Sequence, residues 1–212
     1  MPISAVIFDF NGTLSHDEPV LCRIYRELFA EYGRPISGRD YYERLSGLAE
    51  HAIAEICLGP GDPRIPRFIR ERIDRYRSTV ADGSTVTETT RAAVRFAGER
   101  ARLAIVSGAA REEIVPVVAA AGLGELLATV VADDDVARGK PDPEGYLLAL
   151  AALGVAPGET LVFEDTEAGV ASAKAAGTRV VAVLGTQARE RLANADELVE
   201  TIDVPLLRRL LA

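Results

Sequence analysis

The sequence predicts an α/β protein in which a parallel sheet is combined with an inserted segment made only of helices. Short apolar segments typical of buried strands alternate with helical segments ended by glycine, which is the order of a parallel sheet with crossover helices. Residues 15–81 interrupt this alternation and hold four helical segments but no convincing strand. Polar clusters follow the predicted strands, and open α/β sheets bind ligands at that edge.

Five segments have the apolar, β-favouring character of strands. The first reads Ser-Ala-Val-Ile-Phe and fits a strand buried on both faces. It leads into Asn11-Gly12, a dipeptide that indicates a turn. The predicted strands are residues 4–8, 102–106, 128–132, 160–163 and 179–184.

Helical segments occur both between these strands and in the insert. Those between strands are residues 88–100, 112–121, 142–153 and 168–176. Those in the insert are residues 20–32, 38–45, 49–58 and 67–80. We therefore expect a catalytic core of residues 1–14 and 82–212 and a helical insert of residues 15–81. The arginines between Arg67 and Arg77 are expected to form mostly a charged outer face of the last helix.

Composition excludes several classes of protein. The 212 residues are 48% hydrophobic and 26% charged, which is ordinary for a globular protein of one large domain or a core with a small insert. A net charge of -8 lacks the basic footprint of a nucleic-acid binder, and no segment approaches the roughly 18 apolar residues of a membrane span. The N-terminus runs directly into a strand without a basic region, so we expect a cytoplasmic protein. Cys22 and Cys57 form neither a zinc motif nor a disulfide framework.

Four polar clusters fall at the carboxyl ends of separate predicted strands. Because such ends meet at one edge of a parallel sheet, we expect these side chains to surround one ligand. Turn chemistry alone does not account for four such clusters at such distant positions in the chain. They are Asp9/Asn11/Thr13, Ser107/Gly108, Lys140 in Gly139-Lys140-Pro141-Asp142-Pro143, and Glu164/Asp165.

The residue types in these clusters suit phosphoryl transfer. The Asp9 carboxylate is a usable covalent acceptor for a phosphoryl group. Asp9 and Asp165 can share one hard cation, and carboxylate ligands of this kind suit Mg²⁺. Ser107 offers a hydroxyl and nearby backbone N–H groups at a junction of strand and helix, where anions are favoured. Lys140 supplies a positive charge for the phosphoryl oxygens and orients Asp9.

These clusters resemble the four motifs of the haloacid dehalogenase-like phosphatases. Residues 9–14, Asp-Phe-Asn-Gly-Thr-Leu, resemble the first motif, and Val-Ser-Gly at 106–108 resembles the second. Residues 139–143 resemble the third motif, and Phe-Glu-Asp-Thr at 163–166 with Gly169 resembles the fourth. The resemblance covers the whole chain. It implies a Rossmann-like core and, since the insert lies between the first and second motifs, a helical cap domain at residues 15–81.

The resemblance also implies roles for particular residues. Asp9 is expected to be the nucleophile, acting with Asn11 and Lys140 as the catalytic set. The expected Mg²⁺ ligands are Asp9, the backbone carbonyl of Asn11 and Asp165, with Glu164 close by as a ligand or as support for Lys140. The expected phosphate-binding residues are Ser107, Gly108, Lys140 and Thr13. In the cap, Arg44, Gly47 and His51 lie in or near a stretch that resembles the substrate-specificity loop of the family, and we expect them to contact substrate.

Asn11 departs from the family pattern, which usually has an aspartate two residues after the nucleophile. That aspartate protonates the leaving oxygen and then activates water, and an amide cannot exchange protons in this way. General acid–base catalysis typically contributes about 10²–10⁴-fold, so we expect slow turnover of poor leaving groups. Three explanations compete: a natural enzyme adapted to asparagine, an engineered trap, and deamidation at Asn11-Gly12. We favour the first.

The leading hypothesis is a Mg²⁺-dependent phosphatase for a small phosphorylated metabolite, acting as a monomer or dimer. A phosphomutase of the β-phosphoglucomutase type is an alternative, although it also needs the second aspartate. A catalytically impaired homologue that only binds phosphate is another. A haloacid dehalogenase would need neither Mg²⁺ nor that aspartate, but Glu164-Asp165 resembles a metal motif. A phosphonoacetaldehyde hydrolase needs a cap lysine, and residues 15–81 contain none.

Overall fold

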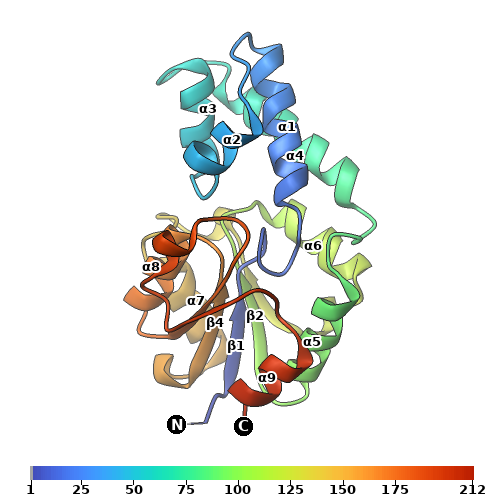
Figure 1. Cartoon of the computed structure of the whole chain (residues 1–212), viewed down its shortest axis with the longest axis vertical. Helices are drawn as coiled ribbons and strands as arrows, with labels where there is room; N and C mark the ends of the chain where they lie inside the picture. The colour runs from blue at the N-terminus through green and yellow to red at the C-terminus, as the bar shows by residue number, and fades with distance from the viewer. Residues whose placement is uncertain (1) are drawn as a thin grey trace.

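A computed structural model, which describes residues 2–212, contains a six-stranded sheet in which all neighbouring strands are parallel. The strand order is β3-β2-β1-β4-β5-β6, so β1 lies between β2 and β4 (Figure 1). The register pairs Phe8 of β1 with Ile105 of β2 and with Phe163 of β4. The three central strands therefore end at about the same level. The strands are β1 (Ala5–Phe8), β2 (Arg102–Val106), β3 (Leu127–Val131), β4 (Thr160–Glu164), β5 (Arg179–Val183) and β6 (Glu197–Val199).

Helices cover both faces of the sheet, because alternate residues of β1 point to opposite faces and are all apolar. Val6 and Phe8 belong to the apolar cluster that includes helices α5 (Glu88–Gly98), α6 (Arg111–Ala120) and α9 (Val204–Leu210). Ala5 and Ile7 belong to a second cluster with α7 (Glu144–Leu153) and α8 (Glu167–Ala175). Short 3₁₀ turns occupy Gly124–Leu126, Asp133–Asp135, Pro157–Glu159 and Arg189–Leu192.

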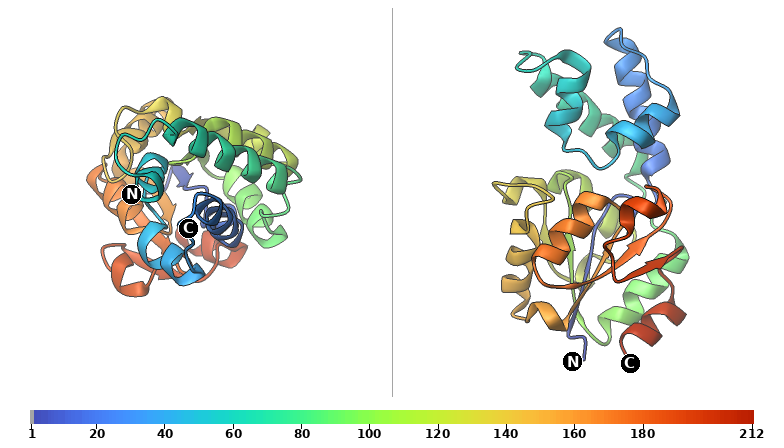
Figure 2. Two further views of the ribbon diagram at one scale, coloured as in Figure 1. Left: turned by 90° about the horizontal axis from the view of Figure 1, so that it is seen from above. Right: turned by 60° about the vertical axis from the view of Figure 1, so that its left-hand side comes forward.

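The remaining helices gather beyond the carboxyl ends of the strands, at the opposite end of the molecule from the two termini (Figures 1 and 2). Aromatic side chains hold these helices together: Phe68 packs edge-on against Phe29, with 6.0 Å between the ring centroids, and also against Tyr25 and Tyr32. We call this group the helical segment. It consists of α1 (Glu18–Glu31), α2 (Gly38–Asp40), the π-helix η1 (Tyr41–Leu45), α3 (Glu50–Leu58) and α4 (Ile65–Val80).

The predicted fold class is confirmed, and the five predicted strands are β1 to β5. The helix predicted at 38–45 is divided, because after Asp40 the backbone widens into a π-helix in which the Ser46 N–H donates to the carbonyl of Tyr41 at 2.9 Å. The strand β6 and the helix α9 were not predicted. Both are short, and β6 is a half-buried strand of three residues at the edge of the sheet, which is too short for a clear alternating pattern.

Between residues 2 and 212, no helix combines the length and apolar character that crossing a bilayer requires.

Candidate active site

The four sequence-predicted clusters meet at the carboxyl edge of the sheet. Asp9 follows β1, Ser107 follows β2 and Asp165 follows β4, while Lys140 comes from the loop before α7. These four residues line one cavity of about 130 Å³. The cavity extends from the sheet edge to the helical segment, which contributes part of its wall. The sheet register therefore produces the expected site from residues that are far apart in the chain.

Lys140 is the centre of the polar network at the bottom of the cavity. Its ammonium group donates to Asp9 Oδ1 at 2.5 Å, to Glu164 Oε1 at 2.5 Å and to the Val106 carbonyl at 3.1 Å. Burial alone would lower the pKa of Lys140, but the charges of Asp9 and Glu164 outweigh it and hold the pKa above its usual range. Lys140 is therefore a fixed cation that positions Asp9.

The Asp9 carboxyl is buried and surrounded by other acids. Burial raises its pKa from 3.8 to about 7, the charge of Lys140 opposes this shift, and Glu164 adds to it. Burial also raises the pKa of Asp165 well above its usual range, and the charge of Asp9 contributes. Concentrated negative charge of this kind favours a bound cation, which in turn favours the ionised carboxylates.

The donor set fits a hard divalent cation. Asp9, Glu164 and Asp165 each offer a carboxylate oxygen, and these oxygens all lie within 4.8 Å of one another. Oδ2 of Asp165 is buried and has no hydrogen-bond partner among residues 2–212. An unpaired buried carboxylate oxygen is costly, and an oxygen-binding cation would satisfy it. The Asn11-Gly12 loop runs against this oxygen: a Cβ at Gly12, whose φ is +74°, would lie 2.0 Å from it.

Glu164 supports the lysine. Its side chain is fully buried and accepts from Lys140, from the Tyr146 hydroxyl at 2.7 Å and from the backbone N–H of Asp165 at 3.1 Å. Asp165 lines the cavity, whereas Glu164 does not. Glu164 is thus placed to hold Lys140. One of its oxygens also lies within 4.8 Å of carboxylate oxygens of Asp9 and Asp165.

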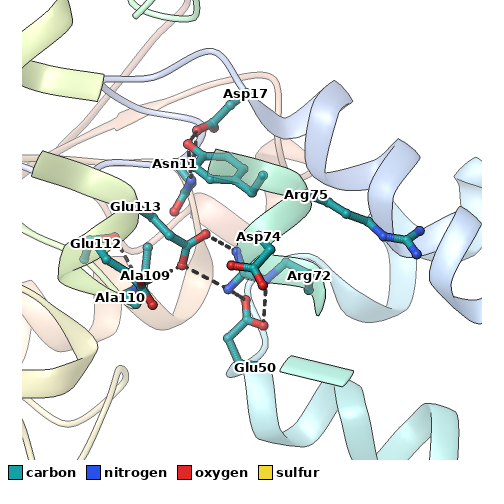
Figure 3. Close-up of polar contacts among 12 residues, drawn as sticks. Asn11, Asp17, Glu50, Arg72, Asp74, Arg75, Ala109, Ala110, Glu112 and Glu113 are labelled. Carbon is teal, nitrogen blue, oxygen red and sulfur yellow. Dashed lines mark hydrogen bonds and ion pairs between the residues drawn. The ribbon is translucent and has the colours of Figure 1, made fainter. Parts of the chain in front are cut away.

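The Asn11 side chain is turned towards a buried acid at the start of α1 (Figure 3). Its Nδ2 donates to Asp17 Oδ2 at 2.9 Å, and the Tyr76 hydroxyl from α4 donates to the same oxygen. The backbone N–H of Gly12 donates to Asp17 Oδ1 at 3.2 Å. Burial raises the pKa of Asp17, and the hydrogen bonds from Tyr76 and Asn11 oppose the shift. The amide therefore serves as a donor to the Asp17 carboxyl, which no motif in the sequence marks as part of the site.

Ser107 and Gly108 line the cavity as expected of phosphate-binding residues. The Ser107 hydroxyl accepts from the backbone N–H of Ala109 at 3.1 Å and is free to donate to a ligand. Thr13 differs from expectation. It is buried, and its hydroxyl lies 3.3 Å from Asp165 Oδ1, to which it donates. Thr13 thus orients a carboxylate and does not line the cavity.

The three substrate-contact residues expected in the helical segment have different positions. Gly47 lines the cavity. Its φ is +84°, and a Cβ at this residue would lie 2.9 Å from Nε2 of Gln187, which lies in the loop after β5. Arg44 is exposed beside Asp40, and His51 is exposed beside Glu55. Neither Arg44 nor His51 lines the cavity, so the structure gives no support to their expected contact with substrate.

Arg72 corrects the expectation of a charged outer face on α4. Its side chain is only 2% exposed and forms ion pairs with Glu113 of α6 and with Glu50 of α3, the latter at 2.5 Å (Figure 3). Phe68, Arg72 and Tyr76 are four residues apart and lie on the buried face of α4. A spacing of four residues places these side chains on one face of the helix, which is a sequence indication that Arg72 is buried. The more exposed arginines around it made the whole segment look like a charged outer face.

Glu18, the first residue of α1, also lines the cavity. Its Oε2 accepts from the Tyr41 hydroxyl at 3.0 Å and lies 3.5 Å from the Ser46 hydroxyl. Burial and the charge of Asp17 raise the pKa of Glu18 to about 7. No sequence signal marks this residue, because an acid at the start of a helix is common on electrostatic grounds alone.

Comparisons with known proteins agree with the geometry. A family model for haloacid dehalogenase-like hydrolases matches residues 3–177. The chain is 34% identical to protein CbbY of Rhodobacter capsulatus over 194 residues, which is 85% of each chain. It is 30% identical to a phosphorylated carbohydrates phosphatase of Thermotoga maritima over 178 residues, which is 82% of each. The crystal structure of a CbbY variant from Rhodobacter sphaeroides in complex with xylulose-(1,5)-bisphosphate has a TM-score of 0.84 and 28% identity, covering 94% of this chain and 95% of that one.

Proposed function

The chain belongs to the haloacid dehalogenase-like hydrolase family, and on this premise we propose that it is a Mg²⁺-dependent phosphatase. Its substrate is a small phosphorylated metabolite, and the reaction passes through a phosphoaspartate on Asp9. The observation that supports this most is the position of Asp9. It lines the cavity, its Oδ1 lies 2.5 Å from Nζ of Lys140, and it forms an acidic cluster with Asp165. Relatives named as phosphatases agree with this assignment.

The residues of the cavity suit the two steps of this reaction. The Asp9 carboxylate attacks phosphorus, and the bond to the leaving oxygen breaks. Lys140 holds Asp9 in position, while Ser107 and the adjacent backbone N–H groups stabilise the charge on the phosphoryl oxygens. Water then attacks the phosphoaspartate and releases inorganic phosphate. Asp9, Asp165 and the carbonyl of Asn11 would hold Mg²⁺, which neutralises charge between the carboxylates and the phosphate when it is bound.

We also propose that residues 15–81 act as a cap domain on a core of residues 1–14 and 82–212. Contacts between the proposed cap and the proposed core support this assignment. Nε2 of Gln187 donates to the Ser46 carbonyl at 3.1 Å, and Arg72 pairs with Glu113. Closure of such a cap excludes bulk water from the phosphoryl group and surrounds the rest of the substrate.

A catalytically impaired homologue is the second candidate, and Asn11 is the observation that favours it. Such a protein would bind phosphate and Mg²⁺ without turnover. A phosphomutase of the β-phosphoglucomutase type is less well supported, because it also needs an acid at position 11. A dehalogenase is less well supported still, because the acidic group around Asp165 is of the metal-binding kind.

The test is a panel of phosphorylated metabolites, together with p-nitrophenyl phosphate, assayed with Mg²⁺ and with EDTA. We expect phosphate release that depends on Mg²⁺ and is lost in Asp9→Asn. Mg²⁺ binding without release from any compound would overturn the phosphatase and support the impaired homologue. Release of halide from a haloacid would support the dehalogenase. Sedimentation and cell fractionation test the further proposals of a monomer or dimer in the cytoplasm.

A further inference from the structure

We propose that Glu18 is the residue that transfers protons in this active site, in the place of the acid that Asn11 cannot provide. The proposal rests on the proposed phosphatase function. Expelling a basic leaving oxygen from phosphorus requires a proton, and the amide of Asn11 has no exchangeable acid to give. Its Nδ2 is moreover engaged with Asp17. The proton must therefore come from another group in the cavity wall.

Five carboxyl side chains line the cavity, and the other four have different tasks or positions. Asp9 is the proposed nucleophile and Asp165 the proposed metal ligand. Glu50 is engaged in an ion pair with Arg72 at 2.5 Å. Asp133 follows β3 at the sheet edge, beside Ser107 and Gly108, and so lies on the side where the phosphoryl oxygens are expected to bind. The five are Asp9, Glu18, Glu50, Asp133 and Asp165.

Glu18 lies on the side of the cavity where the leaving group is expected. In-line attack by Asp9 places the leaving oxygen on the far side of phosphorus, away from β1 and towards the helical segment. Glu18 is the first residue of α1, which rises from the carboxyl edge of the sheet into that segment (Figure 1). The side chain is held by neutral donors, the hydroxyls of Tyr41 and Ser46. Within residues 2–212 it forms no ion pair that would fix it as a carboxylate.

The surroundings of Glu18 favour the protonated form that a proton donor needs. Burial is the main reason that its pKa rises to about 7, and Asp17 and Asp9 repel its negative form, while the Tyr41 hydroxyl stabilises that form. The titratable groups that interact with it are Asp9, Asp17, Cys22, Tyr41, Tyr42 and Asp165.

Each step balances with Glu18 in this role. An Asp9 oxygen bonds to phosphorus, the bond from phosphorus to the leaving oxygen breaks, and the proton of Glu18 moves to that oxygen to give an alcohol. The Glu18 carboxylate then takes a proton from water as the water oxygen bonds to phosphorus. The bond from phosphorus to Asp9 breaks, which restores the Asp9 carboxylate and releases inorganic phosphate. Glu18 is again protonated.

Two aryl phosphates of similar shape test the proposal in pre-steady-state assays with Mg²⁺. p-Nitrophenyl phosphate loses a stable anion without a proton, whereas phenyl phosphate loses a far more basic phenolate. In Glu18→Gln we expect the burst of nitrophenolate to stay within about threefold of the wild type and the burst of phenol to fall about 10²-fold or more. After its burst, the variant should accumulate phosphoaspartate, because the second step also lacks its base.

Glu27→Gln is the matched control, since it makes the same change at an exposed position of the same helix. Glu18→Asp should restore part of the phenyl phosphate reaction and shift its pH profile. An equal loss on both substrates, as a merely structural role predicts, overturns the proposal, and so does an unchanged phenol burst. If the wild type releases phosphate from no compound, the proposed phosphatase function is wrong. If the wild type is active and Glu18→Gln does not change its activity, only the role of Glu18 is wrong.

Discussion

Nδ2 of Asn11 lies 2.9 Å from Oδ2 of Asp17, and this hydrogen bond explains why an amide suits position 11. Asp17 is buried and accepts from Asn11, from the backbone of Gly12 and from Tyr76 of α4. An aspartate at position 11 would direct a second carboxylate at Asp17 in place of a donor. The pair therefore favours a chain adapted to asparagine over a chain with a damaged catalytic acid.

Asn11→Asp is expected to lower the free energy of unfolding by about 1–3 kcal/mol at pH 7, because it replaces a hydrogen bond with a repulsive contact at a buried group. Asp17→Asn in the same chain should restore most of this loss. Urea unfolding of the wild type, both single variants and the double variant gives the coupling energy. A large gain in phosphatase activity from Asn11→Asp without loss of stability would contradict this account and identify the amide as a lesion.

Lys140→Met is expected to abolish phosphate release and to cost about 3–5 kcal/mol of stability, because it leaves Asp9 and Glu164 buried without their cation. The other lysine of the chain is the control. Lys174 forms a half-exposed pair with Asp196, so Lys174→Met should change stability by about 0–1 kcal/mol and leave activity unchanged. Chemical denaturation in EDTA measures both variants, and equal costs would show that Lys140 is not the centre of the buried network.

Mg²⁺ is expected to raise the melting temperature of the wild type, since it binds the folded state through groups that are apart in the unfolded chain. Asp165→Asn should abolish this rise. In EDTA the same variant should match or exceed the stability of the wild type, because it removes a buried carboxylate oxygen that has no donor. Thermal unfolding with and without Mg²⁺ tests this. A variant that keeps the full Mg²⁺ shift would remove Asp165 from the proposed metal site.

The contribution of Asp9 to the stability of the metal-free protein is expected to fall as pH rises from about 4 to 7. The folded pKa of Asp9, about 7, is higher than its ordinary 3.8, so the folded state binds more protons in this interval. Its contribution to stability is complete below pH 4 and is lost as pH rises through 7. Urea unfolding in EDTA at pH 5.5 and 7.5 measures the loss. Asp9→Asn should show a smaller difference between the two values, and an unchanged difference would contradict this assignment.

Arg72→Met is expected to cost about 3–5 kcal/mol, because the Glu113 carboxyl on α6 loses its buried partner. Adding Glu113→Gln should recover part of that cost. Arg75→Met is the control on the same helix: Arg75 pairs with Glu31 at the surface, so we expect a change of about 0–1 kcal/mol. Since Arg72 joins α4 to α6, the variant should also raise KM more than it lowers kcat. Equal stability of the two variants would show that this link contributes nothing.

The sequence by itself determined the parallel α/β class, five of the six strands and the composition of the acidic and basic clusters. These features depend on local properties: an apolar run such as Ala5–Phe8 is long enough to mark a buried strand, and Asp9, Ser107 and Asp165 each follow a strand directly. Because parallel strands end at one edge, adjacency to a strand end was enough to bring Asp9, Ser107 and Asp165 together, whereas Lys140 reaches them from the loop before α7.

Only the tertiary structure decided which partners the remaining side chains have. Arg72 is buried because α4 packs against α6, where Glu113 lies, and Thr13 faces Asp165 instead of the ligand. The pairing of Asn11 with Asp17 and the place of Glu18 in the cavity wall depend on how α1 leaves the sheet edge. No local pattern carries this information, because a charged or amide side chain has the same propensity whether it faces water or a partner from a distant element. Packing between elements decides which of the two it meets.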